Sequence, residues 1–511
     1  MRKRRTWWLL LSIIASIGAA SSCVRPPDPN TLVMLIESSP ANLDPRVGLD
    51  GQSERIDELI FDALLTHDAH LNVQPGLAEK WETPDPLTYI FHLHSGVTFH
   101  DGRPLTSQDV KWTFDSLLQG KVRSTKGATY RFVDHIDAPD DLTVVFHLKQ
   151  PDASLLWNLS EGAIGIVPEG SGQEFNAHPN GSGAFRFVSA EPDKEVVLER
   201  NDHYWGTPPH VRRVRFMVVP DATTRALELR KGSADIAVNS IGYDALPVLA
   251  NQTHLQILRA PGTVVAYMGF NLRDPILKDS RVRQAIAYAL DRQSLIHNLF
   301  RDAARPAASV LPPESWAYDS NIPRYDYAPE RAKELLDQAG YPERNGIRFH
   351  LLMKTSTEEA TRLLAAVLQQ QLRAVGITLD IRTFEFATFF SDVTRGEFQV
   401  YSLRWIGGNE DPDIFEYIYH SARIPPNGAN RGYYTNPRVD VLIDQARIAS
   451  EQAARKQIYD ELQRILAADE PTINLWYLDN IVVANKRVQG LTLNPSGNYD
   501  FLKTADLAST N

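Results

Sequence analysis

The chain has 511 residues, with 53 Lys and Arg against 63 Asp and Glu, 43% hydrophobic residues and a single cysteine. This composition predicts a globular protein with a large core and excludes a mainly disordered chain, and the length suggests about three domains. The net charge of −10 argues against a general nucleic-acid binder, which usually carries a basic stripe, so we expect no nucleic-acid partner.

The first 22 residues are typical of an export signal. A basic segment precedes an apolar run over 7–20, which is shorter than the roughly 20 residues that span a bilayer. Small residues then lead to the sole cysteine, Cys23, and this ending resembles a bacterial lipobox, although Ala20 stands where that pattern prefers Leu. We expect a signal peptide over 1–22, lipid on Cys23 and a proline-rich tether over 23–30. The alternative is an ordinary signal peptide with an incidental cysteine.

The next region, 71–120, predicts a small α+β unit. Residues 89–93 and 97–100 flank Ser95-Gly96 as an antiparallel hairpin. Thr106 and Asp109 form a capping pair for a helix that carries apolar residues at helical spacing.

Two βαβ units follow. A strand over 211–219 precedes a helix that begins after Asp221 and ends at Gly232, and a second strand covers 235–238. The second unit has alternating strands around 347–351 and 377–381, joined by a helix, and the crossover length predicts that they pair in parallel. Helices are also expected around 282–290 and from Pro329 to Gly340. The sequence thus predicts two α/β lobes.

No nucleophile elbow, zinc-protease, phosphate-loop, calcium-loop or dinucleotide motif is present in the sequence. The best metal candidate is the set His92, His94 and His100, but no further ligand has metal-like spacing, and solvated hairpin histidines explain it more simply. We therefore expect no enzyme activity, no cofactor and no metal.

Several segments resemble the bacterial extracellular solute-binding proteins of family 5, the dipeptide and oligopeptide receptors of ABC importers. The resemblance covers nearly the whole chain after the tether and rests on residues 42–45, 75–81, 88–93, 99–110, 181–187, 201–206, 267–271, 281–286 and 436–440. It implies an α/β, two-lobed periplasmic-binding-protein-like fold of the large peptide-receptor type, with an extra α+β domain inserted in the first lobe.

The resemblance also implies a domain layout and a role. We place the first lobe at 31–62, 181–264 and 482–511, the inserted domain at 63–180 and the second lobe at 265–481. We expect an extracytoplasmic, membrane-anchored monomer that captures a small solute, peptide or peptide-like, by hinge closure. Its partners are the ligand, the ABC permease and ATPase subunits, and the membrane through its lipid.

The segment 404–412 bears on which kind of ligand the protein binds. In peptide-binding members an aspartate stands four residues before the proline and holds the ligand's ammonium group; here that place is Gly408. Glu410 or Asp411 can supply a carboxylate from a shifted position, and Arg404 favours an anionic or neutral polar group. The predicted ligand-binding set is Trp405, Arg404, Gly408, Asp411, Glu410, Tyr267, Asn430, Asp50 and Gln52. Two other roles stay open: a secreted metal-dependent hydrolase, and a surface sensor derived from the receptor fold.

Overall fold

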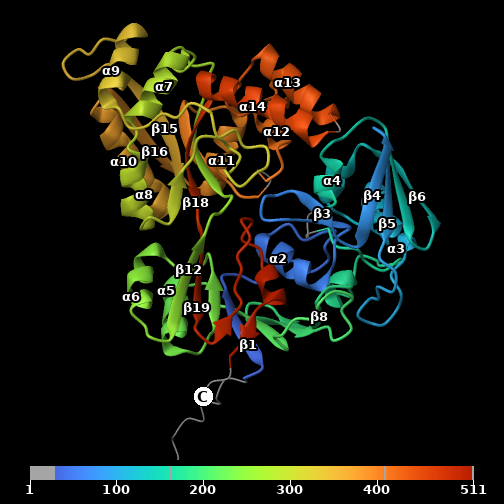
Figure 1. Ribbon diagram of the computed structural model, residues 1–511. Coiled ribbons are helices and arrows are strands. Elements are labelled where there is room, and N and C mark those ends of the chain that lie inside the picture. Colours follow the sequence, from blue (N-terminus) through green and yellow to red (C-terminus); the bar gives the residue numbers. More distant parts are fainter. Residues whose placement is uncertain (1–28, 161–163, 408–409, 450, 509–511) are drawn as a thin grey trace, which may run out of the picture.

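A computed structural model describes residues 29–160, 164–407, 410–449 and 451–508. It contains two large sheets and a smaller third sheet, with helices packed on them (Figure 1). The predicted signal peptide and Cys23 lie outside the described residues. We keep the predicted ranges as names for the first lobe, the insertion and the second lobe.

The first lobe is built on a seven-stranded mixed sheet. Its central strand, β1 (Thr31–Ile36), is buried along its whole length and pairs in parallel with both neighbours, β10 and β11. Leu32, Met34 and Ile36 face the core beneath helix α2, whereas Val33 and Leu35 face α5 and α6, because side chains alternate along a strand. In spatial order the strands are β12 (Leu255–Ala260), β19 (Asn480–Asn485), β11 (Ile236–Val238), β1, β10 (Arg213–Val218), β9 (Glu195–Arg200) and β8 (Phe185–Glu191).

The helices of this lobe confirm the first βαβ unit. Helix α5 (Ala222–Lys231) begins at Asp221, whose side chain accepts from the Thr224 N–H, and ends at Gly232 in the left-handed conformation. The other helices are α2 (Gly51–Ile60) and α6 (Leu246–Ala250), and a short pair of strands, β20 (Val488–Gln489) and β21 (Asp506–Leu507), lies near the C-terminal end of the described chain.

The second lobe has a six-stranded sheet. Strands β15 and β16 pair in parallel across helix α10, as the second βαβ unit predicts. In order the strands are β14 (Ala304–Pro306), β18 (Thr472–Leu478), β13 (Val265–Phe270), β17 (Val400–Trp405), β15 (Phe349–Ser356) and β16 (Ile377–Phe384). The helices are α7 (Ser280–Ala289), α8 (Arg292–Phe300), α9 (Pro329–Gln338), α10 (Glu359–Arg373), α11 (Phe386–Arg395), α12 (Ile414–Tyr419), α13 (Pro437–Ile448) and α14 (Gln452–Asp469).

The insertion carries a four-stranded antiparallel sheet covered on its buried face by helix α3 (Ser107–Leu118). The strand order is β4 (Ala78–Asp85), β5 (Thr88–Leu93), β7 (Thr143–Leu148) and β6 (Val133–Asp140), and the unit also contains α4 (Leu155–Asn158), β2 (Leu65–His67) and β3 (Val73–Pro75). The predicted capping box of Thr106 and Asp109 is confirmed.

The predicted hairpin between 89–93 and 97–100 is wrong. Strand β5 pairs with β4 and β7 instead, and the segment after Gly96 turns into the core, where Val97 and Phe99 are buried. Thr98 forms only an isolated bridge with Pro104. One partner, β4, directly precedes β5 in the chain, and the other, β7, lies farther along it, so the turn at Ser95-Gly96 does not join two paired strands.

The two lobes are joined where the chain crosses between the large sheets, at residues 261–264 and at Asp479 (Figure 1). Strands β12 and β19 pair on one side of the crossing, and β13 and β18 pair on the other. The Leu478 N–H donates to the Val264 carbonyl at 2.8 Å, so the two crossings lie side by side. Paired crossings of this kind form a hinge about which two rigid bodies can rotate.

Candidate functional site

An aromatic wall stands on the two central strands of the second-lobe sheet. Tyr267 on β13 and Trp405 on β17 point to the same face, because Val265 pairs with Trp405 and side chains alternate along each strand. Their rings are stacked, with centroids 5.7 Å apart and planes 9° apart. The Arg431 guanidinium lies 5.1 Å from the Trp405 ring and donates to the Tyr267 hydroxyl at 2.9 Å. The wall is therefore held by a cation over an aromatic ring as well as by stacking.

Asn430 fixes the loop that carries Arg431. Its side chain accepts from the Tyr434 N–H at 2.9 Å and donates to the Tyr434 carbonyl at 2.8 Å. It is 1% exposed, and with Tyr267 and Trp405 it lines a cavity of about 20 Å³, too small for a solute. The Asn430 side chain therefore holds the backbone of this loop in place behind the aromatic wall.

A larger cavity of about 380 Å³ opens on the other side of Trp405, between the second lobe and the insertion. Its volume falls within the usual range for small-molecule sites. From the second lobe it is lined by Trp405, Ile406, Gly407, Asp411, Asp413, Ile414, Tyr417 and Arg447, and from the insertion by Thr129, Arg131, Asp152, Ser154, Trp157 and Asn158. A neighbouring cavity of about 560 Å³ shares Asp152, Trp157, Asp411 and Arg447 with it, so the two cavities adjoin.

Charged groups of both signs meet where these cavities adjoin. Asp411 is 7% exposed and accepts from the Asp413 N–H at 2.6 Å; burial raises the pKa of its carboxyl to about 7, against the opposing charge of Arg455. Burial also raises the pKa of Asp152. Arg447 pairs with Asp413 at 3.0 Å and Glu416 at 3.4 Å. The site therefore has partners for both a cationic and an anionic group of a ligand.

Direct contacts join the insertion to the second lobe beside the cavities. The Ala153 N–H donates to the Arg447 carbonyl at 3.0 Å, and Gln452 donates to the Asn72 side chain at 3.0 Å. The Arg447 guanidinium also lies 5.6 Å from the Phe132 ring. These contacts are few and mainly polar, as expected for surfaces that come together and separate.

Arg404 lies on the opposite face of β17 from Trp405, pairs across the sheet with Ala266 and is exposed. Its charge acts on Tyr243 of the first lobe, where it opposes the rise that burial causes in the tyrosine pKa. Arg404 and Trp405 therefore cannot line one wall of the same cavity, and a role for Arg404 in ligand binding stays a prediction.

The remaining predicted residues are dispersed. Glu410 accepts from the Thr263 hydroxyl at 2.8 Å, next to the hinge, whereas Asp411 faces the cavities. Asp50 caps α2 by accepting from the Ser53 N–H, and Gln52 is buried and accepts from the Tyr499 hydroxyl at 2.9 Å. Gly408 lies outside the described residues. The structure thus brings Trp405, Tyr267, Asn430 and Asp411 together and leaves Asp50 and Gln52 in the first lobe.

Sequence reasoning missed several residues that line the cavities or support their walls: Arg131, Asp152, Trp157, Arg431 and Arg447. Only Arg431 had a local signal, since it follows Asn430 directly. The others come from the insertion or from α13, and their proximity depends on the packing of separate units.

The alternative metal set does not assemble in the described part of the chain. His92 contacts Glu82 at 3.2 Å, and the His94 ring packs against Trp205. His100 is turned inward, 3.0 Å from the Gly183 carbonyl, and burial lowers the pKa of its imidazole. These different surroundings leave the hydrolase alternative without its proposed metal site.

Two lobes joined by paired crossings, with a cavity between the insertion and the second lobe that is lined by aromatic and charged side chains, define a solute-binding receptor. The comparisons with known proteins agree. The model of the bacterial extracellular solute-binding proteins, family 5 (middle), matches residues 72–425, and this chain belongs to that family.

Three similar proteins illustrate the family. The dipeptide-binding protein of Escherichia coli is 27% identical over 96% of both chains. The oligopeptide-binding protein AppA of Bacillus subtilis, solved with a nonapeptide, is 26% identical, with a TM-score of 0.75 over 94% of this chain and 99% of that one. NikZ of Campylobacter jejuni, solved with Ni(L-His), is 27% identical, with a TM-score of 0.76 over 94% of this chain and all of that one.

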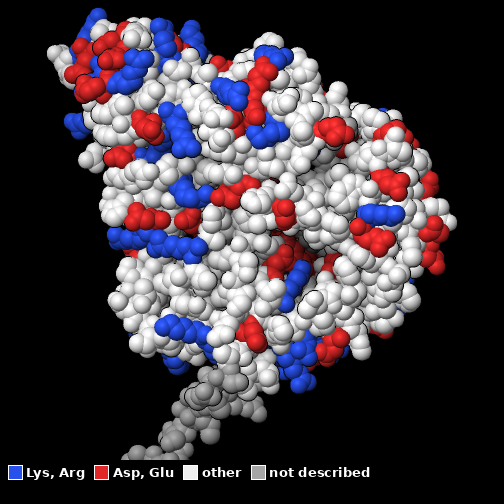
Figure 2. All heavy atoms as spheres, viewed as in Figure 1, with Lys and Arg blue, Asp and Glu red and all other residues white. Residues whose placement is uncertain are grey.

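Membership in this family gives the role: the chain is a substrate-binding protein that captures a solute outside the cytoplasm for an ABC importer. Among the described residues, no helix has the length and apolar character needed to cross a membrane. The face shown in Figure 2 carries interspersed acidic and basic side chains and no continuous basic stripe.

Proposed function

We propose that the solute is a small zwitterionic peptide or peptide-like molecule, bound between the insertion and the second lobe. The observation that carries this proposal is the 380 Å³ cavity, where buried carboxylates and guanidinium groups meet beside Trp405 and Trp157. A short peptide has an ammonium at one end and a carboxylate at the other, so it needs partners of both signs. The peptide-binding relatives support this class of ligand.

Particular residues suit particular parts of such a ligand. Asp411, buried and facing the cavity, suits the ammonium, because a carboxylate without a full ion-pair partner gains most from a cation. Arg131 suits the carboxylate: its guanidinium contacts the Ala128 carbonyl at 3.3 Å and the Phe132 ring at 4.4 Å, which leaves donors for a ligand. Trp405, Trp157 and Tyr417 then provide apolar walls for side chains.

Calorimetry on the untagged protein tests this assignment. We expect a dipeptide or tripeptide to bind, and we expect N-acetylation to weaken binding by about tenfold or more, since it leaves the buried Asp411 carboxylate without a cation. C-terminal amidation removes the pair with Arg131, which is exposed, and should weaken binding by a smaller factor. The matched variants are Asp411→Asn, which should remove the sensitivity to acetylation, and Arg131→Gln, which should remove the sensitivity to amidation. Equal binding of free and capped peptides contradicts the proposal and favours another solute class, such as the metal chelate of one relative.

We also propose that binding is the whole activity and that the protein acts as a monomer. The ligand should be recovered unchanged after prolonged incubation. Size-exclusion chromatography of the protein with its ligand should give the mass of a single chain. Product that accumulates beyond one equivalent would indicate an enzyme instead.

The lipid anchor on Cys23 is a further proposal, supported by the basic segment, the short apolar run and the sole cysteine. Cys23→Ser should move the protein from the membrane fraction to the soluble extracytoplasmic fraction. If the variant still fractionates with membranes, the anchor is elsewhere.

A further inference from the structure

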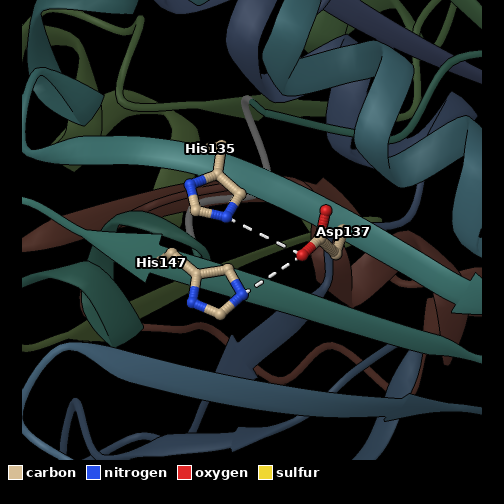
Figure 3. A group of neighbouring side chains, drawn as sticks. All are labelled: His135, Asp137 and His147. Carbon is tan, nitrogen blue, oxygen red and sulfur yellow. Dashed lines mark ion pairs between the residues drawn. The ribbon is translucent and has the colours of Figure 1, made fainter.

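Three potential metal ligands gather on the outer face of the insertion sheet, away from the cavities described above. His135 on β6 and His147 on β7 are directly paired across the two antiparallel strands. Their imidazole rings are nearly parallel, with centroids 4.3 Å apart and planes 13° apart. Asp137 lies two residues along β6 from His135 and points toward both rings (Figure 3).

The donor atoms converge on one point. The Asp137 Oδ2 atom lies 3.3 Å from Nε2 of His147 and 3.7 Å from Nε2 of His135, and one ligand atom from each residue lies within 4.8 Å of the others. Ligand atoms around a tetrahedral ion with bonds near 2.1 Å are about 3.4 Å apart. The exposed His135 and half-buried His147 imidazoles can close the difference by rotating about their side-chain bonds, without moving the strands.

A neighbouring carboxylate orients one of the rings. The Nδ1 atom of His135 lies 3.0 Å from Oδ2 of Asp134, an arrangement in which the imidazole N–H donates to the carboxylate. A histidine that donates from Nδ1 keeps the lone pair of Nε2 free, and metal-binding histidines usually carry such an outer partner. The pair thus presents Nε2 of His135 toward Asp137 and His147.

We infer that His135, Asp137 and His147 form a binding site for a divalent transition-metal ion, with Zn²⁺ as the best match to two imidazoles and one carboxylate. This donor set disfavours Mg²⁺ and Ca²⁺, which prefer oxygen ligands alone. Because three protein ligands leave at least one position for water, the site is open and accessible from solvent. A bound ion would link β6 to β7 through side chains as well as through the backbone ladder.

The inference is independent of the solute proposal, because none of the three residues lines either cavity. The other reading of the cluster is two exposed histidines that pair weakly with a carboxylate and bind no ion. A titration with zinc distinguishes these two.

The experiment uses the untagged full chain, stripped of metal, and Zn²⁺ titrated in the presence of a competing chromophoric chelator. We expect one saturable zinc equivalent per chain. His147→Ala and Asp137→Asn should each weaken it at least about tenfold, and Asp134→Asn should weaken it about 10- to 100-fold, as loss of an outer partner usually does. The control is His350→Ala, which removes an exposed histidine 3.3 Å from Asp380 and should leave binding unchanged.

Thermal unfolding provides a second measurement. Zn²⁺ should raise the melting temperature of the parent and of His350→Ala, but not that of His147→Ala, since an ion that binds only the folded state stabilises it. Mg²⁺ should have no effect. The inference is overturned if the parent shows no saturable zinc binding, or if His147→Ala binds zinc as the parent does with its circular dichroism unchanged.

Discussion

The Arg431 guanidinium contacts both residues of the aromatic wall: it lies 5.1 Å from the Trp405 ring and donates to the Tyr267 hydroxyl at 2.9 Å. Arg431 is also 5.3 Å from the Phe390 ring on α11. Because Trp405, Tyr267 and Phe390 all belong to the second lobe, these contacts do not depend on where the insertion lies. Closure then has to bring only the insertion residues to it, which lowers the ordering cost of binding.

Trp405→Ala should weaken ligand binding by about 10- to 100-fold, because a large aromatic side chain at the centre of a site commonly contributes about 2 kcal/mol or more. Trp405→Phe keeps an aromatic wall and should lose less. Calorimetry with the best-binding peptide measures both. If the alanine variant binds as the parent does and its melting temperature is unchanged, Trp405 is a packing residue and the cavity beside it is not the site.

Asp411→Asn should change how stability depends on pH. Burial raises the pKa of Asp411 from its usual value of 3.8 to about 7, so the folded state holds this proton over a range where the unfolded chain has lost it. The carboxyl therefore contributes most to stability below pH 4, and that contribution is lost as the pH rises to about 7. The free energy of unfolding involved is on the order of 1–4 kcal/mol.

The asparagine variant removes this proton equilibrium and can still accept from the Asp413 N–H. The difference in unfolding free energy between variant and parent should therefore shift in favour of the variant from pH 4 to pH 8. Comparing the two at each pH cancels the effect of other buried carboxyls, such as Glu470, whose pKa burial raises to about 8. A difference that does not vary with pH would show that Asp411 titrates normally.

Arg447→Gln should destabilise the second lobe, because Asp413 would lose its cationic partner while it remains largely buried, and Glu416 would keep only Arg423. Removing one member of a buried ion pair typically costs about 3–5 kcal/mol, and partial exposure here reduces that to roughly 2–3 kcal/mol. The double variant Arg447→Gln, Asp413→Asn should recover part of the loss, because it removes the carboxylate that is left without a cation. Urea unfolding of the four proteins measures the coupling, and strictly additive effects would show that the pair contributes nothing.

Local signals were sufficient for much of the fold. Helix α5 could be bounded from Asp221 and Gly232 alone, because an N-cap side chain and a left-handed glycine act on the nearest turn. The parallel pairing of β15 with β16 followed from the length of the connection. The hairpin after β5 failed because a turn at Gly96 specifies a change of direction but not the partner strand.

The candidate site was harder to predict from the sequence, because local patterns do not specify contacts between distant segments. Trp405 and Tyr267 were identified through a resemblance, and the strand register then explains their stacking. Asp152 and Arg447 are nearly 300 residues apart, and each has an ordinary local context. They share a cavity only because the insertion closes on the second lobe, and no periodicity or motif encodes that contact.

Gly262→Ala should alter the hinge. Gly262 lies in one chain crossing, and an added Cβ would stand 2.3 Å from the Leu478 carbonyl oxygen of the other, a distance that real Cβ atoms do not adopt. Because the Leu478 oxygen is a backbone atom that cannot turn aside, the crossings have to separate, at a cost of about 1–3 kcal/mol. We therefore expect a lower melting temperature and a changed angle between the lobes.

Small-angle scattering with and without ligand measures that change. The parent should show a smaller radius of gyration when a peptide is bound, whereas Gly262→Ala should show a smaller difference between the two states and weaker binding. The matched control is Gly242→Ala in the first lobe, where an added Cβ meets no atom within 4 Å and should have little effect. If Gly262→Ala closes on ligand with the parent's change in radius and the parent's affinity, the crossing at residues 261–264 does not govern the motion, and rotation would have to take place elsewhere in the chain.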